Sequence, residues 1–200
     1  SSGHASFMFD SGQLRWNTYS TSTNGLFTSN AYFRDTGWYH VVFAFDATES
    51  TTTDRIKVYV NGERLTSSSY TTPDGSDTPV NNTVEHSIGA RYQGATSGDV
   101  NITNNYFIDG LALTPESFGF TDPLTNTWRP KKYEGTFGTN GFYLPMDGNS
   151  PIGDDKSGQG NDWTPVNFGG SVELPKATGA KPILNTTQGG TQAGVGVFGS

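Results

Sequence analysis

The sequence of 200 residues contains no cysteine, and this absence removes several classes of protein at once. Without thiols there is no disulfide framework, no thiolate zinc site and no cysteine nucleophile. Stability therefore has to come from the packing of side chains. A chain of this length is long enough for one sizeable core, or for a core with an appended arm.

Basic residues and long apolar runs are also scarce. The chain has 12 Lys and Arg against 19 Asp and Glu, and its basic residues are scattered, so there is no basic stripe to neutralise phosphates. We therefore expect no nucleic-acid partner. No apolar run approaches the ~20 residues that a membrane-spanning helix requires, so we expect no membrane insertion.

Helical periodicity is missing as well, and turn residues take its place. The chain has 26 Gly and 10 Pro, and no apolar period of 3.6 residues lasts over three turns. At most, PESFGF at 115–120 forms one short helical turn. Many short strands joined by turns require this kind of composition, so we expect an all-β protein.

Short apolar or alternating runs between turn residues predict the strands. These runs lie at 6–9, 13–16, 38–45, 55–60, 84–92, 106–113 and 141–146. After 55–60 comes Asn61-Gly62, which suits the left-handed positions of a tight hairpin. The run 38–45 is apolar on both faces, as a central strand covered on each side would be. Two packed antiparallel sheets follow as the architecture, and their core should include Trp38, Phe43, Phe45, Phe107 and Phe118.

Four landmarks occur in the order found in one known family. They are Gly37-Trp38-Tyr39-His40-Val41, Val60-Asn61-Gly62, Ile88-Gly89 and Ile108-Asp109. Over roughly residues 5–113 the chain resembles the laminin-G-like and pentraxin-like branch of the concanavalin A-like lectin/glucanase superfamily. The resemblance implies an antiparallel jelly-roll β-sandwich.

The remainder of the chain resembles something different. Residues 118–168 look like a segment that follows such domains in structural proteins of tailed marine bacteriophages. The part from 141 to 164 also resembles the first strand and turn of ordinary laminin-G-like domains, which leaves a circularly permuted sandwich as an open alternative. We expect a sandwich body at 1–120, a Pro/Gly-rich connection with a returning strand and polar turn at 121–168, and an extended Gly/Thr-rich arm at 169–200.

Enzymatic chemistry finds no support in the sequence. The superfamily includes glucanases with a Glu-x-Asp-x-x-Glu pattern, and this chain lacks it, because each of its six glutamates is isolated. No Gly-x-Ser-x-Gly elbow follows an apolar strand. His4, His40 and His86 lie far apart, and for His40 we expect a structural role. We therefore expect no enzyme activity.

The stretch GDDKSGQGNDW at 153–163 admits two interpretations. It resembles a calcium loop, but an EF-hand started at Asp155 would place Val166 where the closing Glu belongs. A looser calcium site remains an alternative, with Asp147, Asn149, Asp155 and Asn161 as its ligands. The same residues are typical of a turn, because the side chains of Asp, Asn and Ser form hydrogen bonds with nearby backbone and Gly adopts positive φ. We favour the turn.

Aromatic residues with polar neighbours suggest one ligand site. A sugar ring packs on an aromatic face while neighbouring amides or carboxylates bind its hydroxyls. The loop at 92–106 has such a composition, and a plain polar surface loop is the alternative interpretation. The candidate ligand-binding residues are Tyr92, Asp99, Asn101, Asn104, Tyr106 and Trp128.

These observations lead to a functional hypothesis. The resemblance indicates a non-enzymatic structural protein of a virion, a fibre or surface-decorating module on the outside of the particle. Its expected partners are neighbouring copies, with a trimer as one form, or other virion proteins, and a cell-surface glycan is a further partner. A dedicated carbohydrate-binding adhesin is the alternative. A polysaccharide-degrading glycosidase is the third and least favoured hypothesis.

Overall fold

The computed structural model describes residues 4–19, 24–34, 37–72, 79–90, 101–147 and 151–166. These residues fall into two compact units. The first lies within Ser1–His86 and Ala112–Lys131, and the second within Ser87–Leu111 and Lys132–Ser200. The expected boundaries after residues 120 and 168 stay predictions, and the arm at 169–200 lies outside the described residues.

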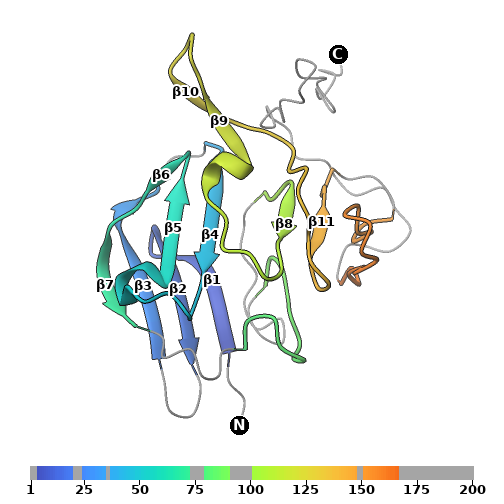
Figure 1. Ribbon diagram of the computed structural model, residues 1–200, viewed down its shortest axis with the longest axis horizontal. Helices are drawn as coiled ribbons and strands as arrows, with labels where there is room; N and C mark the ends of the chain where they lie inside the picture. Colours follow the sequence, from blue (N-terminus) through green and yellow to red (C-terminus); the bar gives the residue numbers. More distant parts are fainter. Residues whose placement is uncertain are drawn as a thin grey trace. The chain divides into compact units, whose positions relative to one another are not determined.

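Two antiparallel sheets form the first unit. The four-stranded sheet has the order β1-β2-β3-β7, and the three-stranded sheet has the order β4-β5-β6. Figure 1 shows the two sheets as layers that face each other. The strands are β1 (His4–Asp10), β2 (Gln13–Tyr19), β3 (Asn24–Tyr32), β4 (Val41–Phe45), β5 (Ile56–Val60), β6 (Glu63–Arg64) and β7 (Ser67–Thr71).

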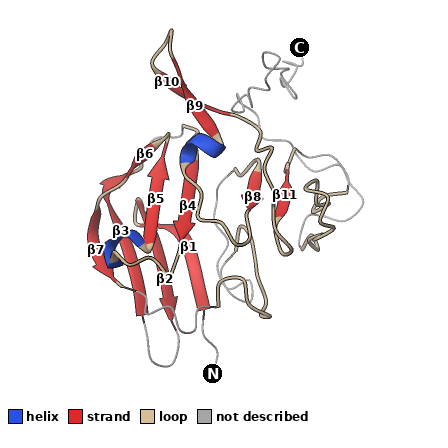
Figure 2. Ribbon diagram, in the orientation of Figure 1, coloured by secondary structure: helices blue, strands red, loops and turns tan. Residues whose placement is uncertain are grey.

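Shorter elements complete the described chain. The hairpin of β9 (Gly119–Asp122) and β10 (Thr127–Pro130) belongs to the first unit, and the pair of β8 (Asn105–Phe107) and β11 (Phe142–Leu144) belongs to the second. Helix in the described residues is limited to the 3-10 turns η1 (Thr52–Asp54) and η3 (Pro115–Ser117), as Figure 2 shows. No helix in this part of the chain is long and apolar enough to cross a membrane. The structure is all-β and antiparallel, as expected.

The core of the first unit forms around Trp16. Leu14 and Trp16 alternate along β2 with partly exposed residues, and both are fully buried. Across the sandwich, the Trp16 ring lies 5.5 Å from the ring of Phe43 and 5.3 Å from that of Phe45. Burial of a large aromatic side chain stabilises the folded state by several kcal/mol. Replacement of a buried Trp by Ala typically lowers the free energy of unfolding by ~3–5 kcal/mol. The core cluster consists of Leu14, Trp16, Phe27, Ile56, Val58 and Val60.

The hairpin between β5 and β6 forms as the sequence predicts. Asn61 and Gly62 have φ values of +50° and +86°, which are left-handed conformations, and Val60 pairs with Glu63. Asn61 also binds the residue that precedes β4. Its side-chain Oδ1 accepts the N–H of His40, and its own N–H donates to the His40 carbonyl. The strand expected at 38–45 therefore begins only at Val41.

Other differences from the sequence predictions have local causes. β4 lies at the end of its sheet among the described strands, although its side chains are covered on both faces, with Val42 and Ala44 buried opposite Phe43. The strand expected at 106–113 ends at Phe107, because the chain turns at Asp109, whose N–H donates to Phe137 O. The described part of 84–92 forms no strand. Strands β3, β7, β9 and β10 are largely polar and were not predicted.

Gly25 on β3 leaves room for the Trp16 ring, and this close approach gives a test of the core. A Cβ at this position would lie 2.7 Å from Trp16 Cζ3 and 2.8 Å from Thr18 Cγ2. We expect Gly25→Ala to lower the free energy of unfolding by about 1–3 kcal/mol, measured by urea denaturation. Gly37→Ala is the matched control, because a Cβ there meets nothing within 4 Å, and it should change stability by less than about 0.5 kcal/mol. Equal effects of the two substitutions would contradict this account of the core.

Candidate functional site

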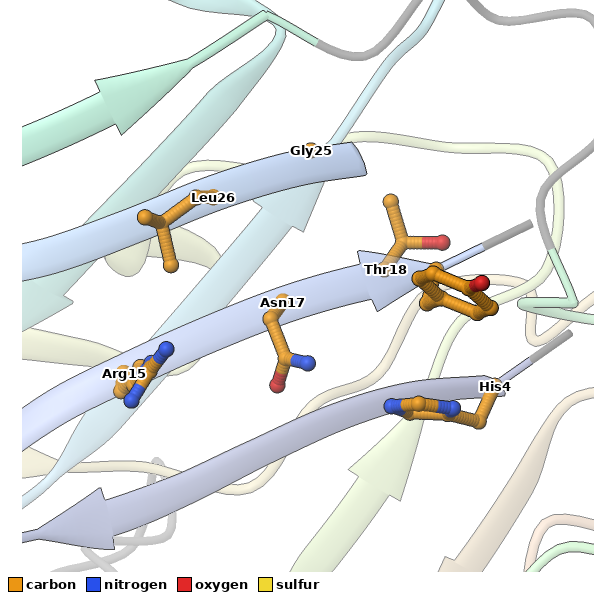
Figure 3. Close-up of a pocket in the computed structure, with 7 residues that line it drawn as sticks. His4, Arg15, Asn17, Thr18, Gly25 and Leu26 are labelled. Atoms are coloured by element: carbon orange, nitrogen blue, oxygen red, sulfur yellow. The ribbon is translucent and has the colours of Figure 1, made fainter. Parts of the chain in front are cut away.

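A hollow of about 320 Å³ lies on the first unit, on the face of the four-stranded sheet that points away from the core. Figure 3 shows side chains from β1, β2 and β3 around it. Three adjacent strands therefore build this site, and no loop of the described chain contributes to its lining. The lining residues are His4, Arg15, Asn17, Thr18, Tyr19, Gly25 and Leu26.

The alternation of β2 determines which side chains reach the hollow. Because Leu14 and Trp16 point into the core, Arg15, Asn17 and Tyr19 point to the opposite face. The register between strands then sets their neighbours. His4 lies directly opposite Tyr19 across the β1–β2 pair, and Leu26 lies opposite Asn17 across the β2–β3 pair.

An exposed aromatic pair forms one end of the hollow. The rings of His4 and Tyr19 are stacked, with centroids 5.7 Å apart and an angle of 24° between their planes. His4 is partly buried, and Tyr19 is 48% exposed. Its ring therefore offers apolar surface and a hydroxyl to a ligand at the same time.

Polar groups beside this pair are held by their own partners. Ser6 Oγ donates to Asn17 Oδ1 at 2.5 Å, which leaves the amide N–H groups of Asn17 as donors for a ligand. Arg15 Nη1 donates to Asp10 Oδ2 at 2.8 Å. Hydrogen bonds from Arg15 and Ser11 hold the pKa of Asp10 below its ordinary value. The side chains of Asn17 and Arg15 are thus oriented before any ligand arrives.

Two buried polar atoms have no hydrogen-bond partner among the described residues, Arg15 Nε and Thr18 Oγ1. Thr18 is buried on the core side of β2 with Leu14 and Trp16, and Arg15 Nε is itself buried, so neither atom is open to a ligand. The hydrogen-bonding side chains that reach the hollow are those of Arg15, Asn17 and Tyr19, on the opposite side of β2.

The ligand residues predicted in the loop at 92–106 lie elsewhere, in the second unit. Tyr92 and Asp99 are outside the described residues, and Asn101 is exposed. Asn104 and Tyr106 do come together, through Tyr143, whose hydroxyl donates to Asn104 Oδ1 at 2.8 Å. The rings of Tyr106 and Tyr143 stack 4.4 Å apart. Burial, followed by the effect of Tyr143, raises the pKa of Tyr106. Tyr106 thus packs against its own unit.

Trp128, the remaining predicted ligand residue, belongs to the first unit, where its side chain packs against other residues of that unit. Its indole Nε1 donates to His40 Nδ1 at 2.9 Å, and its ring packs directly on Gly62 and Gly119. Burial of His40 lowers its pKa to about 4, so the ring is neutral near pH 7 and accepts this hydrogen bond. The ring of His40 thus makes a structural hydrogen bond, and its partner is the indole of Trp128.

Comparison with known families identifies the fold. The family model Laminin_G_3, described as the concanavalin A-like lectin/glucanases superfamily, matches residues 1–116. The chain belongs to this superfamily. No curated protein and no solved structure matches it.

Membership of the superfamily confirms the resemblance over residues 5–113 and agrees with the two facing antiparallel sheets. The jelly-roll path and the circular permutation stay predictions. The bacteriophage origin inferred from residues 118–168 receives no support from the superfamily match, which ends before that segment. All the residues that line the hollow lie inside the matched range.

The polar turn at 153–163 lies beyond the part matched to the superfamily, and its centre is the buried side chain of Asp155. Oδ1 accepts the N–H groups of Tyr143 and Ser157, each at 2.8 Å. Oδ2 accepts Ser157 Oγ at 2.7 Å and Asn161 N at 3.0 Å. Burial acts to raise the pKa of Asp155, but these hydrogen bonds outweigh it, and the pKa is lowered.

This geometry favours the turn over a cation site. Four protein donors occupy the carboxylate oxygens of Asp155 that a calcium ion would need. Asn161 Nδ2 donates to the carbonyls of Thr139 and Gly141, so this side chain ties the turn to the segment before β11. Asp147 is exposed, and Asn149 lies outside the described residues. Within the described chain, no three His, Asp or Glu side chains cluster as a metal site would require. The calcium site stays a prediction.

Replacement of the Asp155 carboxylate tests its role as the centre of the turn. We expect Asp155→Asn to lower the free energy of unfolding by about 1–3 kcal/mol, because an amide N–H₂ would face backbone donors in place of an acceptor oxygen. Chemical denaturation of the full chain measures the effect. Asp154→Asn is the control, because among the described residues the carboxylate of Asp154 pairs with the exposed Lys156, and it should cost less than about 1 kcal/mol. Stabilisation of the unmodified chain by calcium that is lost in Asp155→Asn would contradict the turn interpretation.

Proposed function

We propose that this chain is a non-enzymatic carbohydrate-binding module and that the hollow on β1, β2 and β3 is its binding site. One observation carries the proposal: an exposed, stacked His4–Tyr19 pair lies beside oriented amide and guanidinium donors in an open depression. A pyranose needs this combination, an aromatic surface for its C–H face and fixed donors for its hydroxyls. The superfamily includes lectins, which agrees with this use of the fold.

The absence of carboxylates from the lining supports binding over hydrolysis. A glycosidase needs two carboxyl groups, roughly 5 Å apart in retaining and 6.5–9.5 Å apart in inverting enzymes. Within the part of the chain that the structure describes, no Asp or Glu lines the hollow. A sugar seated on Tyr19 would therefore meet donors and an aromatic surface, but no acid and no nucleophile.

A place on a virion surface is a further part of the proposal. It rests on the sequence resemblance of residues 118–168 to phage structural proteins and on no other observation. A glycan-binding module would serve there as a fibre or surface-decorating protein that contacts the host cell. This part is independent of the hollow, because either could hold without the other.

Glycan binding by the hollow is tested with an array and then by calorimetry on the hits. We expect Tyr19→Ala to weaken binding by about tenfold or more, a loss of about 1.4 kcal/mol, because the stacking surface is removed. Asn17→Ala should also weaken binding, through the loss of an oriented donor. Thermal unfolding of each variant checks that the fold is intact.

Tyr32→Ala is the matched control, because Tyr32 is an exposed tyrosine of the same sheet that does not line the hollow. It should leave binding unchanged. A blank array, or an equal loss of affinity in the Tyr32→Ala variant, would overturn the proposed function at this site.

Assembly with a neighbouring copy is the second candidate function, and the edge of β1 favours it. This strand ends its sheet, and its outer edge pairs with no strand of the described chain. It contains neither Lys nor Pro, which commonly protect exposed edges. Phe7 and Phe9 on this strand are 41% and 47% exposed, although their rings also contact Phe43 and Phe33. In an antiparallel pair of two β1 strands centred on Phe7, His4 of each copy would lie opposite Asp10 of the other, so the edge is self-complementary.

The lack of cysteine makes this pairing testable by cross-linking. In the Phe7→Cys variant the new thiol lies on the two-fold axis, so we expect a disulfide-linked dimer after mild oxidation. The Thr71→Cys variant, exposed on the opposite edge strand β7, is the control and should stay uncross-linked. Sedimentation of the unmodified chain should show a dimer that dissociates on dilution. A monomer at all concentrations, or a trimer, would contradict this pairing.

A further inference from the structure

The hollow differs in charge from the rest of the protein. The chain as a whole carries 19 acidic against 12 basic residues and a formal net charge of −7. Among the described residues, the lining of the hollow contains one arginine, one histidine and no carboxylate. A ligand on this surface thus meets hydrogen-bond donors and the guanidinium of Arg15, whose ion-pair partner Asp10 lies outside the lining.

Arg15 has hydrogen-bonding capacity to spare. A guanidinium carries five N–H donors in a planar fork. One nitrogen, Nη1, donates to Asp10, and Nε is buried with no partner among the described residues. Asp10 therefore holds the plane of the guanidinium in place, and because Nε is buried, a ligand can reach only the Nη end of this side chain, which is 40% exposed overall. Asp10 is not itself part of the lining, so its carboxylate does not fill the hollow.

The spacing between Arg15 and the aromatic pair sets the size of the ligand. Arg15, Asn17 and Tyr19 follow one another along the same face of β2, at a spacing of two residues. Successive side chains on one face of a strand lie roughly 7 Å apart, about the span of one sugar ring and its substituent. Tyr19 and Arg15 are two such steps apart, roughly 14 Å, so a carboxylate at Arg15 has to belong to another sugar unit of the oligosaccharide whose ring stacks on Tyr19. Figure 3 shows Arg15 and Asn17 in this order along β2.

We infer that the glycan taken by this hollow is acidic, a uronic-acid-containing oligosaccharide whose carboxylate binds Arg15 while a sugar ring stacks on Tyr19. A planar carboxylate matches the fork of a guanidinium better than a hydroxyl does, and hydrogen bonds between charged partners are the stronger ones. The inference rests on the proposed function and adds the class of ligand to it.

The test compares one oligosaccharide with and without its charge. Calorimetry on the full chain uses a galacturonic acid trisaccharide and its methyl ester, which keeps the sugar rings and removes the negative charge. We expect the acid to bind at least about tenfold more tightly than the ester at low ionic strength. This advantage should shrink as salt is added, because Arg15 is partly exposed and its field is screened.

Two arginine variants then assign the effect to the hollow. Arg15→Gln should bind acid and ester with nearly equal affinity, and Arg15→Lys should restore part of the preference, because it keeps the charge without the fork. Arg64→Gln is the matched control and should keep the full preference. Arg64 is a similarly exposed arginine, paired with Asp54, that does not line the hollow.

The outcomes separate the inference from the proposed function. If acid and ester bind equally well, or if Arg15→Gln keeps the preference for the acid, the inference is overturned and the carbohydrate-binding function stands. If neither trisaccharide binds but neutral glycans on the array do, the inference again falls alone. If no glycan of any kind binds, the proposed function fails and the inference falls with it.

Discussion

The contact of the Trp16 indole with Phe43 and Phe45 joins the two sheets, and the rest of the first unit depends on it. Trp16 lies on the second strand of its sheet and reaches across the sandwich to β4. The ring has room only because Gly25 on the neighbouring strand carries no side chain. With no cysteine in the chain, no disulfide can substitute for this contact.

The same packing also determines the outer face. In a strand, consecutive side chains point to opposite sides, so the burial of Leu14 and Trp16 forces Arg15 and Asn17 outward. A slip of one residue in the pairing of β2 would expose the indole and bury the guanidinium. The core therefore holds the candidate site in register. A ligand that binds to rigid strands loses little free energy to the ordering of the protein.

Much of the fold could be predicted from the sequence, and the reason is local. Asn61-Gly62 after an alternating run identifies its hairpin without reference to any distant residue. The polar strands β3 and β7 carry no such signal, because Ser, Thr and Asn are as typical of loops as of strands. Their strand structure comes from pairing with β2 and with each other, which only the folded chain provides.

The candidate site was harder to predict, since its residues meet only through strand pairing. The loop at 92–106 suggests a ligand site because its polar and aromatic residues are close in the sequence. His4, Tyr19 and Leu26 come together through the register of three strands, which composition does not reveal. Trp128 is a different case. An aromatic residue between polar neighbours suggests a sugar platform, but its N–H is engaged by His40 and its ring packs on two glycines. An aromatic side chain serves a ligand only where the fold leaves its face uncovered, as it does at Tyr19.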